Sequence, residues 1–168
     1  MPRYNCGMIE IRKATSGDEG AVWQIIKSVI AGGDTYVFAP DSPEDEMIAY
    51  WFSTEKYVYV AEENGEILGT YWIKANQPGL GSHVGNGAYM MSANAKGKGI
   101  GRLMAEHSIE EARRIGFKSI QFNFVVKSNE VAVNLWKRVG FEIIGEIPDA
   151  FDHKEHGLTN AYIMYRKL

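Results

Sequence analysis

The sequence predicts a mixed α/β fold in which helices flank a mostly antiparallel sheet, with the element order β-α-α-β-β-β-α-β-α-β-β. Three observations predict it. Two strand-like segments, 57–61 and 66–74, enclose the pair Asn64-Gly65, which is a strong hairpin signal. Other segments repeat apolar residues at helical spacing. The strand-helix-strand unit at 83–126 supplies the parallel junction of the sheet.

The first elements are indicated by alternation and by helix-start signals. Ile9 and Ile11 alternate with polar residues, as in a half-buried strand. Ser16 and Glu19 form a capping box that opens a helix, and the glycines at 32–33 end it. The remaining expected elements are a helix that starts at Ser42 and Pro43 and runs to Phe52, the two hairpin strands, a strand at 83–92, a helix at 99–115, a strand at 118–126, a helix at 129–139, and strands near 141–147 and 160–166.

Three later segments carry expectations about side-chain placement. In the strand at 83–92, Gly85 and Gly87 indicate a bulge or a close backbone approach. The strand at 118–126 places Ile120, Phe122, Phe124 and Val126 on one face and Gln121 and Asn123 on the other. A polar loop between the last two strands contains Asp149, Asp152, His153 and His156.

Composition indicates one ordinary globular domain. The 168 residues are expected to form a single domain at 8–168 after a short disordered leader at 1–7. Eighteen Lys plus Arg against 21 Asp plus Glu give a net charge of -3, which argues against a nucleic-acid partner. Cys6 is the only cysteine, and no segment has the form of a signal peptide or a membrane span. We therefore expect a soluble cytoplasmic protein with no membrane partner.

The clearest motif is the glycine-rich turn Lys96-Gly97-Lys98-Gly99-Ile100-Gly101-Arg102, between an expected strand and an expected helix. Glycines let the main chain approach a ligand closely, and the first amides of a helix attract an anion. The turn therefore favours a phosphate group. The alternative is a tight turn whose basic side chains are merely solvated. Its spacing fits neither a Walker loop nor a dinucleotide-binding fingerprint.

This turn resembles the pyrophosphate loop of GCN5-related N-acetyltransferases, which reads Arg or Gln, two residues, Gly, one residue, and Gly or Ala. Lys96, Gly99 and Gly101 stand at the defined positions, with Lys where Arg or Gln is usual. The resemblance runs from about Met8 to Leu168. It includes a second motif of the family, an Asn-x-x-Ala sequence with a later aromatic residue and Gly-Phe, which is matched by Asn129, Ala132, Trp136, Gly140 and Phe141.

The resemblance implies the fold of this family and acetyl-CoA as the cosubstrate. Backbone amides of 97–101 would hold the pyrophosphate, and the strand near Met90 and Met91 would pair with the pantetheine arm. The thioester would lie between the strands that end at Ser92 and begin at Lys118. The residues expected to bind coenzyme A are Met90, Met91, Lys96, Gly97, Lys98, Gly99, Ile100, Gly101, Arg102 and Asn129.

A narrower resemblance concerns the acceptor. The segments 82–86, 122–125 and 128–129, together with Trp136, look like those of fungal azetidine-2-carboxylate acetyltransferases. Those enzymes acetylate the ring nitrogen of proline-like imino acids. This resemblance implies that the partner of the protein is a small-molecule amine.

Aromatic residues and histidines are the candidates for contact with that acceptor. The loop at 34–45 contains Tyr36 and Phe38, which suit a small pocket better than an open groove for a basic peptide. His83 and His153 are candidate bases, because imidazole titrates near neutral pH. Their alternative is an exposed or structural histidine. We expect Tyr36, Phe38 and His153 to bind the acceptor and His83 to act in catalysis.

Three asparagines, Asn86, Asn123 and Asn129, are the other expected catalytic residues. An amide has no titratable proton, so these side chains could only orient the thioester or a water molecule. Each has a structural alternative. Asn86 could form a turn, Asn123 could be a solvated strand residue, and Asn129 could cap a helix.

Proton transfer sets the chemical demand on the site. Deprotonating an amine of pKa near 10.4 at pH 7 costs about 4.6 kcal/mol, whereas an unprotonated thiolate costs only about 2 kcal/mol. A base or a water relay is therefore needed more than an acid. The family often has a tyrosine acid where this chain has Trp136, whose indole yields no proton. Water or Tyr89 could protonate the thiolate, and the position of Trp136 in an apolar stripe favours a structural role.

The sequence therefore predicts an acetyl-CoA-dependent N-acetyltransferase that acts on a small amine, such as a proline-like imino acid. Direct transfer is expected, because Cys6 lies in the leader and is not placed to carry an acyl group. The alternatives are a non-catalytic acyl-CoA-binding or sensing module and a protein-lysine acetyltransferase. No metal site is expected, since no residues have metal-ligand spacing. The aromatic strands are compatible with a homodimer.

Overall fold

The structure, a computed structural model, describes residues 9–168, and its elements follow the predicted order. The predictions for the leader at 1–7, including Cys6, lie outside the described residues, as does Met8. The strands are β1 (Ile9–Lys13), β2 (Tyr57–Glu63), β3 (Glu66–Ala75), β4 (Val84–Met91), β5 (Ser119–Val126), β6 (Glu142–His153) and β7 (Gly157–Lys167), and the helices are α1 (Glu19–Gly32), α2 (Glu44–Trp51), α3 (Ile100–Ile115) and α4 (Glu130–Arg138).

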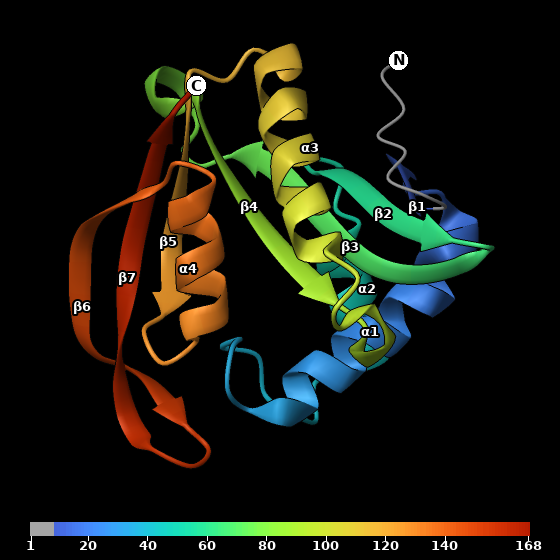
Figure 1. Ribbon diagram of the computed structural model, residues 1–168, viewed down its shortest axis with the longest axis horizontal. Helices are drawn as coiled ribbons and strands as arrows, with labels where there is room; N and C mark the ends of the chain where they lie inside the picture. The colour runs from blue at the N-terminus through green and yellow to red at the C-terminus, as the bar shows by residue number, and fades with distance from the viewer. Residues whose placement is uncertain (1–8) are drawn as a thin grey trace.

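The strands form one seven-stranded sheet with the order β1-β2-β3-β4-β5-β7-β6 (Figure 1). Neighbouring strands are antiparallel except β4 and β5, which are parallel. The connection between these two strands contains α3, as the strand-helix-strand unit predicts. The prediction of a mixed, mostly antiparallel sheet flanked by helices is confirmed.

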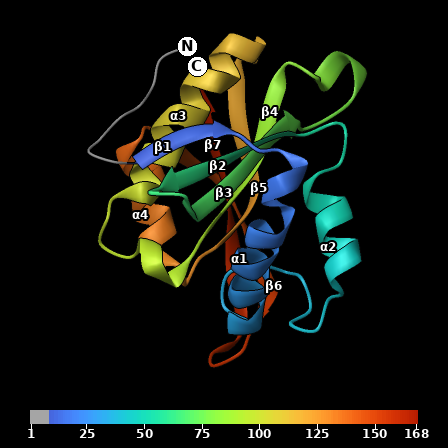
Figure 2. The same ribbon diagram turned by 90° about the vertical axis from the view of Figure 1, so that its right-hand side faces the viewer.

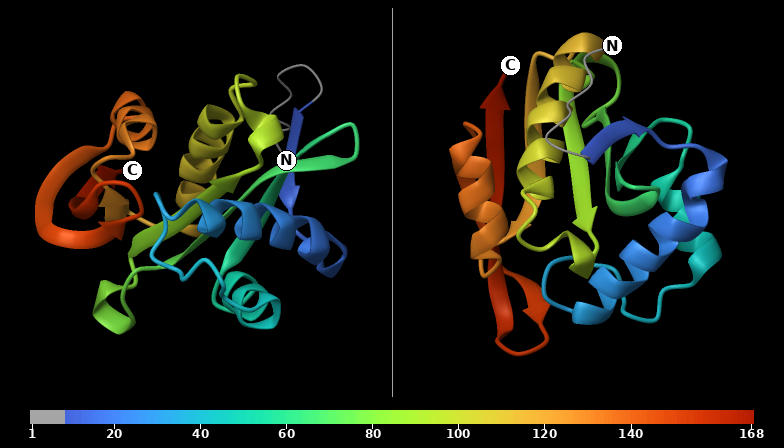
Figure 3. Two further views of the ribbon diagram at one scale, coloured as in Figure 1. Left: turned by 90° about the horizontal axis from the view of Figure 1, so that it is seen from below. Right: turned by 45° about the vertical axis from the view of Figure 1, so that its right-hand side comes forward.

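Helices cover both faces of the sheet, so the protein has two apolar cores (Figures 2 and 3). On one face, α1 and α2 bury Ile26 and Trp51 in a cluster with Trp72 of β3. On the other face, α3 and α4 bury Met104 and Trp136. The central strands are therefore covered on both sides, and a ligand needs a gap between two strands to reach into the sheet. None of the helices in residues 9–168 is long and apolar enough to cross a membrane.

The start of the first helix differs from the predicted capping box. Thr15 and Asp18 form the box in place of Ser16 and Glu19, because the Asp18 carboxylate accepts bonds from the Thr15 backbone N at 2.7 Å and from its hydroxyl at 3.1 Å. Asp18 also pairs with Arg12 of β1 at 2.8 Å. The bond from the Arg12 guanidinium, together with those from Thr15, holds the pKa of Asp18 well below its usual range.

The predicted turn residues adopt the conformations that their types favour. Asn64 and Gly65 join β2 to β3 with φ values of 53° and 84°, which confirms the hairpin. Gly33 and Gly116 follow α1 and α3 in the left-handed conformation.

β4 and β5 pair over a short distance before they separate. Val84 lies opposite Ser119 and Gly85 lies opposite Ile120, and the ladder between these two strands stops there. Beyond this point β4 continues to pair with β3, and β5 with β7. The two strands therefore open into a gap toward the end of β4 that precedes α3 (Figure 1).

The two glycines of β4 allow close backbone approach. A Cβ on Gly85 would lie 3.2 Å from the Phe117 ring, and one on Gly87 would lie 2.9 Å from the Trp72 carbonyl oxygen. β4 keeps an unbroken register with β3 from Gly85 to Met91, so the alternative of a bulge within this ladder is wrong. Close packing explains both glycines.

A bulge lies instead in β5 and overturns the predicted alternation. The register of β5 with β7 shifts between Phe122 and Val125. As a result Phe124 is 36% exposed, whereas Val125 is 8% exposed. Asn123 is exposed, so it faces away from the core as predicted.

β6 and β7 form a longer hairpin than predicted. β6 extends to His153 and β7 begins at Gly157, which leaves only a short turn at 154–156. Phe151, 6% exposed and opposite Thr159, continues the apolar packing past an irregularity in the ladder. The expectation of a long polar loop was wrong, since β6 includes three of its residues, Asp149, Asp152 and His153.

Candidate active site

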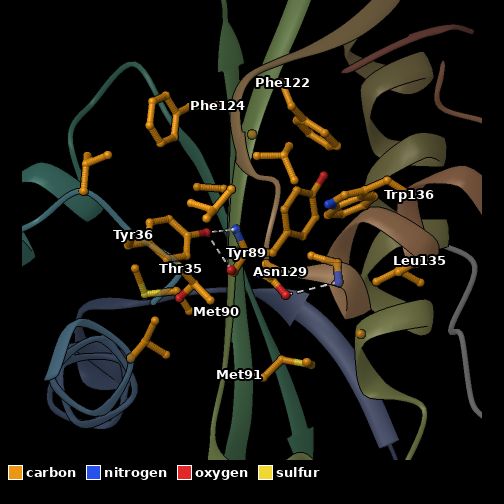
Figure 4. Close-up of a pocket in the computed structure, with 18 of the residues that line it drawn as sticks. Thr35, Tyr36, Tyr89, Met90, Met91, Phe122, Phe124, Asn129, Leu135 and Trp136 are labelled. Atoms are coloured by element: carbon orange, nitrogen blue, oxygen red, sulfur yellow. Dashed lines mark hydrogen bonds between the residues drawn. The ribbon is translucent and has the colours of Figure 1, made fainter. Parts of the chain in front are cut away.

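A pocket of about 440 Å³ lies where β4 and β5 separate (Figure 4). Its walls come mainly from these two strands, from the N-terminal part of α3, from α4 and from the loop that follows α1, with single residues of α1, α2 and β3. Polar backbone groups of the strands lie beside a largely apolar lining. The aromatic residues that line it are Tyr36, Phe38, Tyr50, Trp72, Tyr89, Phe122, Phe124 and Trp136.

The backbone of β4 directs polar groups toward this pocket, where β5 no longer pairs with them. The Val84 oxygen and the Ser92 nitrogen bond toward β3, at 2.8 Å and 2.9 Å, whereas the His83 oxygen accepts from the Lys118 nitrogen on the β5 side at 2.8 Å. Backbone groups alternate in direction along a strand. The even-numbered residues of β4 therefore bond toward β3, and those that face the gap are Gly87, Tyr89 and Met91.

Tyr36 occupies one position on this edge. Its hydroxyl donates a hydrogen bond to the Tyr89 carbonyl oxygen at 2.6 Å and accepts one from the Tyr89 nitrogen at 2.9 Å (Figure 4). Burial raises the pKa of Tyr36, so the phenol is neutral at physiological pH. Phe38 stacks on Tyr36 with ring centroids 6.3 Å apart. Both residues predicted to bind the acceptor from this loop thus line the pocket.

The glycine-rich turn follows the same strand and has the form of an anion cradle. Gly97 and Gly99 adopt positive φ values of 78° and 72°, and α3 begins at Ile100. The first amides of a helix have no intrahelical partner, and the helix dipole adds positive potential there. A Cβ on Gly97 or Gly99 would meet no atom within 4 Å, so the space beside the turn is open.

The basic side chains of the turn are only partly engaged. Lys98 pairs with Glu63 at the end of β2, and Arg102 pairs with Glu106 one helical turn along, at 2.7 Å. Lys96 is exposed. These contacts leave the cradle to the backbone amides, with Lys96 nearest in sequence to the first of them.

The two methionines at the end of β4 face different surroundings. Met90 is 2% exposed and packs in the core beneath α1, while Met91 is 40% exposed. A Cβ on Gly101 would lie 3.2 Å from the Met91 sulfur, so the strand edge and the start of α3 meet at this point. Ile100 is 1% exposed, so its side chain lies in the core and only its backbone can contact a ligand.

The structure brings the three predicted asparagines to the same pocket. Asn86 accepts a bond from the Gly87 nitrogen at 2.8 Å, and Asn123 donates to Asn76 at 2.7 Å. Asn129 caps α4 by accepting from the Ala132 nitrogen at 3.3 Å. Asn129 is thus a cap that also lines the pocket.

The structure does not bring the two predicted histidine bases to the pocket. His83 is exposed in the turn before β4, about 20 Å along the strand from Tyr89. His153 is 8% exposed, and its Nδ1 accepts from the Glu155 and His156 nitrogens at 3.0 Å and 3.2 Å. Its ring is thus fixed by the hairpin turn. Residues 9–168 contain no group of His, Cys, Asp or Glu side chains arranged to hold a metal ion.

Trp136 and Tyr89 pack together between the sheet and α4. Their ring centroids are 4.7 Å apart, and Trp136 is 6% exposed. The Tyr89 hydroxyl donates to Ser108 of α3 at 2.8 Å, and burial raises its pKa. Tyr89 is therefore a weak acid whose proton is already engaged.

No side chain that titrates near neutral pH lines the pocket. A cation, Lys56, lies behind its wall, with its Nζ 3.3 Å from the centroid of the Tyr50 ring and 4.6 Å from that of Trp72. Burial lowers the pKa of Lys56 to about 8. The pocket therefore positions groups through hydrogen bonds and shape, and it supplies no carboxylate or imidazole.

Sequence reasoning missed several residues of the pocket wall. Tyr50 and Trp72 line it, although they lie 46 and 24 positions before Lys96, the first residue of the glycine turn. The only signal in the sequence was the aromatic character of α2 and β3. Asn76 lies in the loop after β3, and its bond to Asn123 depends on the tertiary fold.

Comparison with known proteins identifies the family. Residues 28–141, more than half of the chain, match the model of the Acetyltransferase (GNAT) family. N-acetyltransferase aca1 of Schizosaccharomyces pombe is 44% identical over 98 residues, which are 58% of this chain and 47% of that protein. Protein SPT10 of Saccharomyces cerevisiae is 32% identical over 102 residues, 61% of this chain and 16% of that protein. The chain thus spans less than half the length of these curated relatives.

Solved structures agree with this match. A GCN5-related N-acetyltransferase from Kribbella flavida has a TM-score of 0.92 and 34% identity, with 96% of this chain and 98% of that chain covered. The structure of yncA from Salmonella typhimurium with its cofactor acetyl-CoA has a TM-score of 0.85 at 21% identity, covering 96% and 95% of the two chains, and shows likeness of fold. The chain belongs to the acetyltransferase (GNAT) family.

Proposed function

We propose that the chain is an N-acetyltransferase that uses acetyl-CoA and transfers the acetyl group directly to a small amine. The observation that carries this proposal is the continuity of one backbone surface. The amides of Gly97 and of 99–101 lead to the edge of β4 at Met91, and that edge leads into the pocket. The Lys98 nitrogen between them bonds to the Ala95 oxygen at 3.2 Å. Family membership supports the same conclusion.

The turn and the strand edge fit the two parts of coenzyme A. A diphosphate needs several backbone donors in an open concavity, which the turn at Gly97 and Gly99 offers. The pantetheine arm carries amides, which can pair with the backbone groups of Met91. When bound, acetyl-CoA supplies a thioester whose carbonyl carbon is open to attack by a nitrogen.

The residues of the pocket act mainly by positioning. Asn123 and Asn86 can hold the acceptor or a water molecule beside the strand edge, and the apolar walls exclude bulk solvent. The new carbon–nitrogen bond replaces the carbon–sulfur bond. The proton of the nitrogen passes to a water molecule, because no carboxylate or imidazole lines the pocket. The thiolate takes its proton from solvent.

The shape of the pocket supports a small acceptor. Tyr36 and Phe38 from the loop after α1 close one side, and Tyr50 and Trp72 form the wall behind them. Flat rings suit a compact cyclic amine better than an extended peptide. Together with the resemblance at 122–125, this wall supports a proline-like imino acid as the acceptor, rather than a protein lysine.

The test is release of free thiol from acetyl-CoA in the presence of azetidine-2-carboxylate, proline, simple primary amines and a lysine peptide. We expect the cyclic imino acids to give the highest kcat/KM. A higher value for the lysine peptide would refute the small-amine proposal. Tight acetyl-CoA binding with no thiol release for any acceptor would favour a non-catalytic binding module. The pocket lining is compatible with such a module, because it contains no side chain that titrates near neutral pH.

Other expectations stay predictions. They are a cytoplasmic location, a homodimer, and a single domain at 8–168 that follows a separate leader. Size-exclusion chromatography with light scattering tests the homodimer directly.

A further inference from the structure

The hydroxyl of Tyr36 lies inside the pocket, against the edge of β4 that faces the gap. It comes from the loop after α1, yet both of its hydrogen bonds are to the backbone of Tyr89 in β4, at 2.6 Å and 2.9 Å. Figure 4 shows the phenol reaching across the pocket to this strand. The hydroxyl therefore lies directly on the edge of β4, which a substrate is expected to occupy.

The position along β4 tells which part of the substrate Tyr36 would meet. The gap-facing residues are spaced by about 7 Å, and Tyr89 is the next one after Met91 on the way from the glycine turn into the pocket. If the turn holds the diphosphate and Met91 pairs with the pantetheine arm, the acyl end of the substrate comes next. We propose that the Tyr36 hydroxyl donates a hydrogen bond to the thioester oxygen during acetyl transfer, an inference that rests on the proposed function.

The bonds already present prepare the hydroxyl for this role. The Tyr89 N–H donates to the Tyr36 oxygen, which polarises the O–H bond and makes it a stronger donor. The Tyr36 hydroxyl donates its proton in a hydrogen bond to the Tyr89 carbonyl oxygen, and a rotation about the C–O bond of the phenol redirects it. An amide N–H of the pantetheine arm can then replace it on that carbonyl oxygen.

Tyr36 would act as a hydrogen-bond donor and not as an acid. Burial raises the pKa of its phenol far above that of a thiol, so the phenol keeps its proton when the thiolate leaves. Negative charge grows on the thioester oxygen as the nitrogen attacks and returns to the departing sulfur as the carbon–sulfur bond breaks. Tyr36 stabilises that oxygen without any net proton transfer.

Other hydroxyl groups near the strand are less suited to this task. The Tyr89 hydroxyl bonds to Ser108 on the α3 side of the sheet. Trp136 is packed against Tyr89 and Phe122. Within the described residues 9–168, Tyr36 is the pocket-lining side chain whose hydroxyl bonds to the edge of β4.

The test compares two ligands that differ by one acetyl group and therefore by the thioester carbonyl. Calorimetry gives the dissociation constants of acetyl-CoA and of CoA for the wild type, for Tyr36→Phe and for the control Tyr57→Phe, which removes a hydroxyl from an exposed residue of β2 outside the pocket lining. We expect Tyr36→Phe to reduce the preference for acetyl-CoA over CoA by about 3- to 10-fold. We expect the control to keep the wild-type ratio. A thermal melt shows that each variant is folded.

An unchanged ratio for Tyr36→Phe overturns the inference, because a tyrosine that only holds its loop in place would shift both dissociation constants equally. With a working acceptor, kcat should fall by about 10- to 100-fold while the KM for acetyl-CoA rises by no more than about 10-fold. The binding ratio needs no acceptor. If the three proteins show the expected binding ratios but the wild type transfers no acetyl group, the proposed function is refuted and the hydrogen bond from Tyr36 is still supported.

Discussion

The Asn123 side chain donates a hydrogen bond to the Asn76 side-chain oxygen at 2.7 Å, which links β5 to the loop after β3. The Asn123 oxygen accepts in turn from Gln121 at 3.0 Å. Both ends of the Asn123 amide are therefore held by neighbours while the residue lines the pocket. An amide fixed in this way can orient an acceptor with little loss of side-chain entropy on binding.

Asn123→Ala should lower kcat/KM for the acceptor by about 10-fold and leave the dissociation constant of acetyl-CoA within about 2-fold, because the change removes one polar contact at the acceptor side. Steady-state kinetics and calorimetry check this. Asn76→Ala should have a smaller effect in the same direction, since it frees the Asn123 amide without removing it. A large loss of acetyl-CoA affinity in either variant would place Asn123 with the cofactor instead.

Trp136→Phe should retain turnover within about 3-fold, because the indole cannot supply a proton. Stability should fall by about 1–3 kcal/mol, since the ring is 6% exposed and packs 4.5 Å from Phe122 between centroids. Thiol-release kinetics and urea unfolding measure the two effects. A loss of turnover greater than 100-fold with normal stability would show that the indole N–H takes part in the reaction.

The pH dependence of kcat/KM should follow the acceptor amine. No lining residue titrates near neutral pH, and burial raises the pKa of both Tyr36 and Tyr89, so they stay neutral. The rate should then rise about 10-fold per pH unit between pH 6 and 9 for an amine of pKa near 10.

Lys56, whose pKa is lowered to about 8, is the group that could distort this profile from behind the wall. Lys56→Met should leave the slope of the pH profile of kcat/KM unchanged. A plateau near pH 7 in both proteins would reveal a base that the pocket lining does not contain.

Asp18→Asn should destabilise the fold by about 2 kcal/mol at pH 7, because it breaks the charged bonds to Arg12 and weakens those to Thr15. The folded-state pKa of Asp18 lies below its ordinary value of 3.8, so the ion pair contributes fully above that pH. The contribution is lost as the pH falls below about 4, where the unfolded chain binds the proton more readily. The difference between wild type and variant should shrink there.

Urea unfolding at pH 7 and at pH 3 tests this, with Glu19→Gln as the matched control. Glu19 is the acid that the sequence pattern favours for the box, and its change should cost less than about 0.5 kcal/mol. Equal effects of the two substitutions would contradict the observed cap.

The elements and their order followed from local signals, because periodicity, Asn64-Gly65 and the helix-ending glycines act over a few residues. Features that depend on tertiary pairing did not follow. The bulge that buries Val125 and exposes Phe124 is fixed by the register of β5 with β7. The hairpin past Phe151 forms because that side chain finds a core, which the surrounding polar residues concealed.

The site was partly predictable for the same reason. The turn at 97–101 and the asparagines could be found, since a motif or a polar residue within an apolar strand marks each of them. The bonds from Tyr36 to Tyr89 join residues 53 positions apart, and no local pattern indicates them. His83 is likewise far from the pocket because it precedes β4, whereas the pocket lies further along that strand, and this follows only from the tertiary fold.

The most direct test of the account is a titration of the ¹⁵N-labelled protein with acetyl-CoA, followed by amide chemical shifts. Amides of 97–101 and of Met91 should move together with one dissociation constant, because they would bond to the diphosphate and to the pantetheine arm. If acetyl-CoA binds while these amides stay unmoved, or if the shifts cluster elsewhere, the backbone surface described here does not hold the coenzyme.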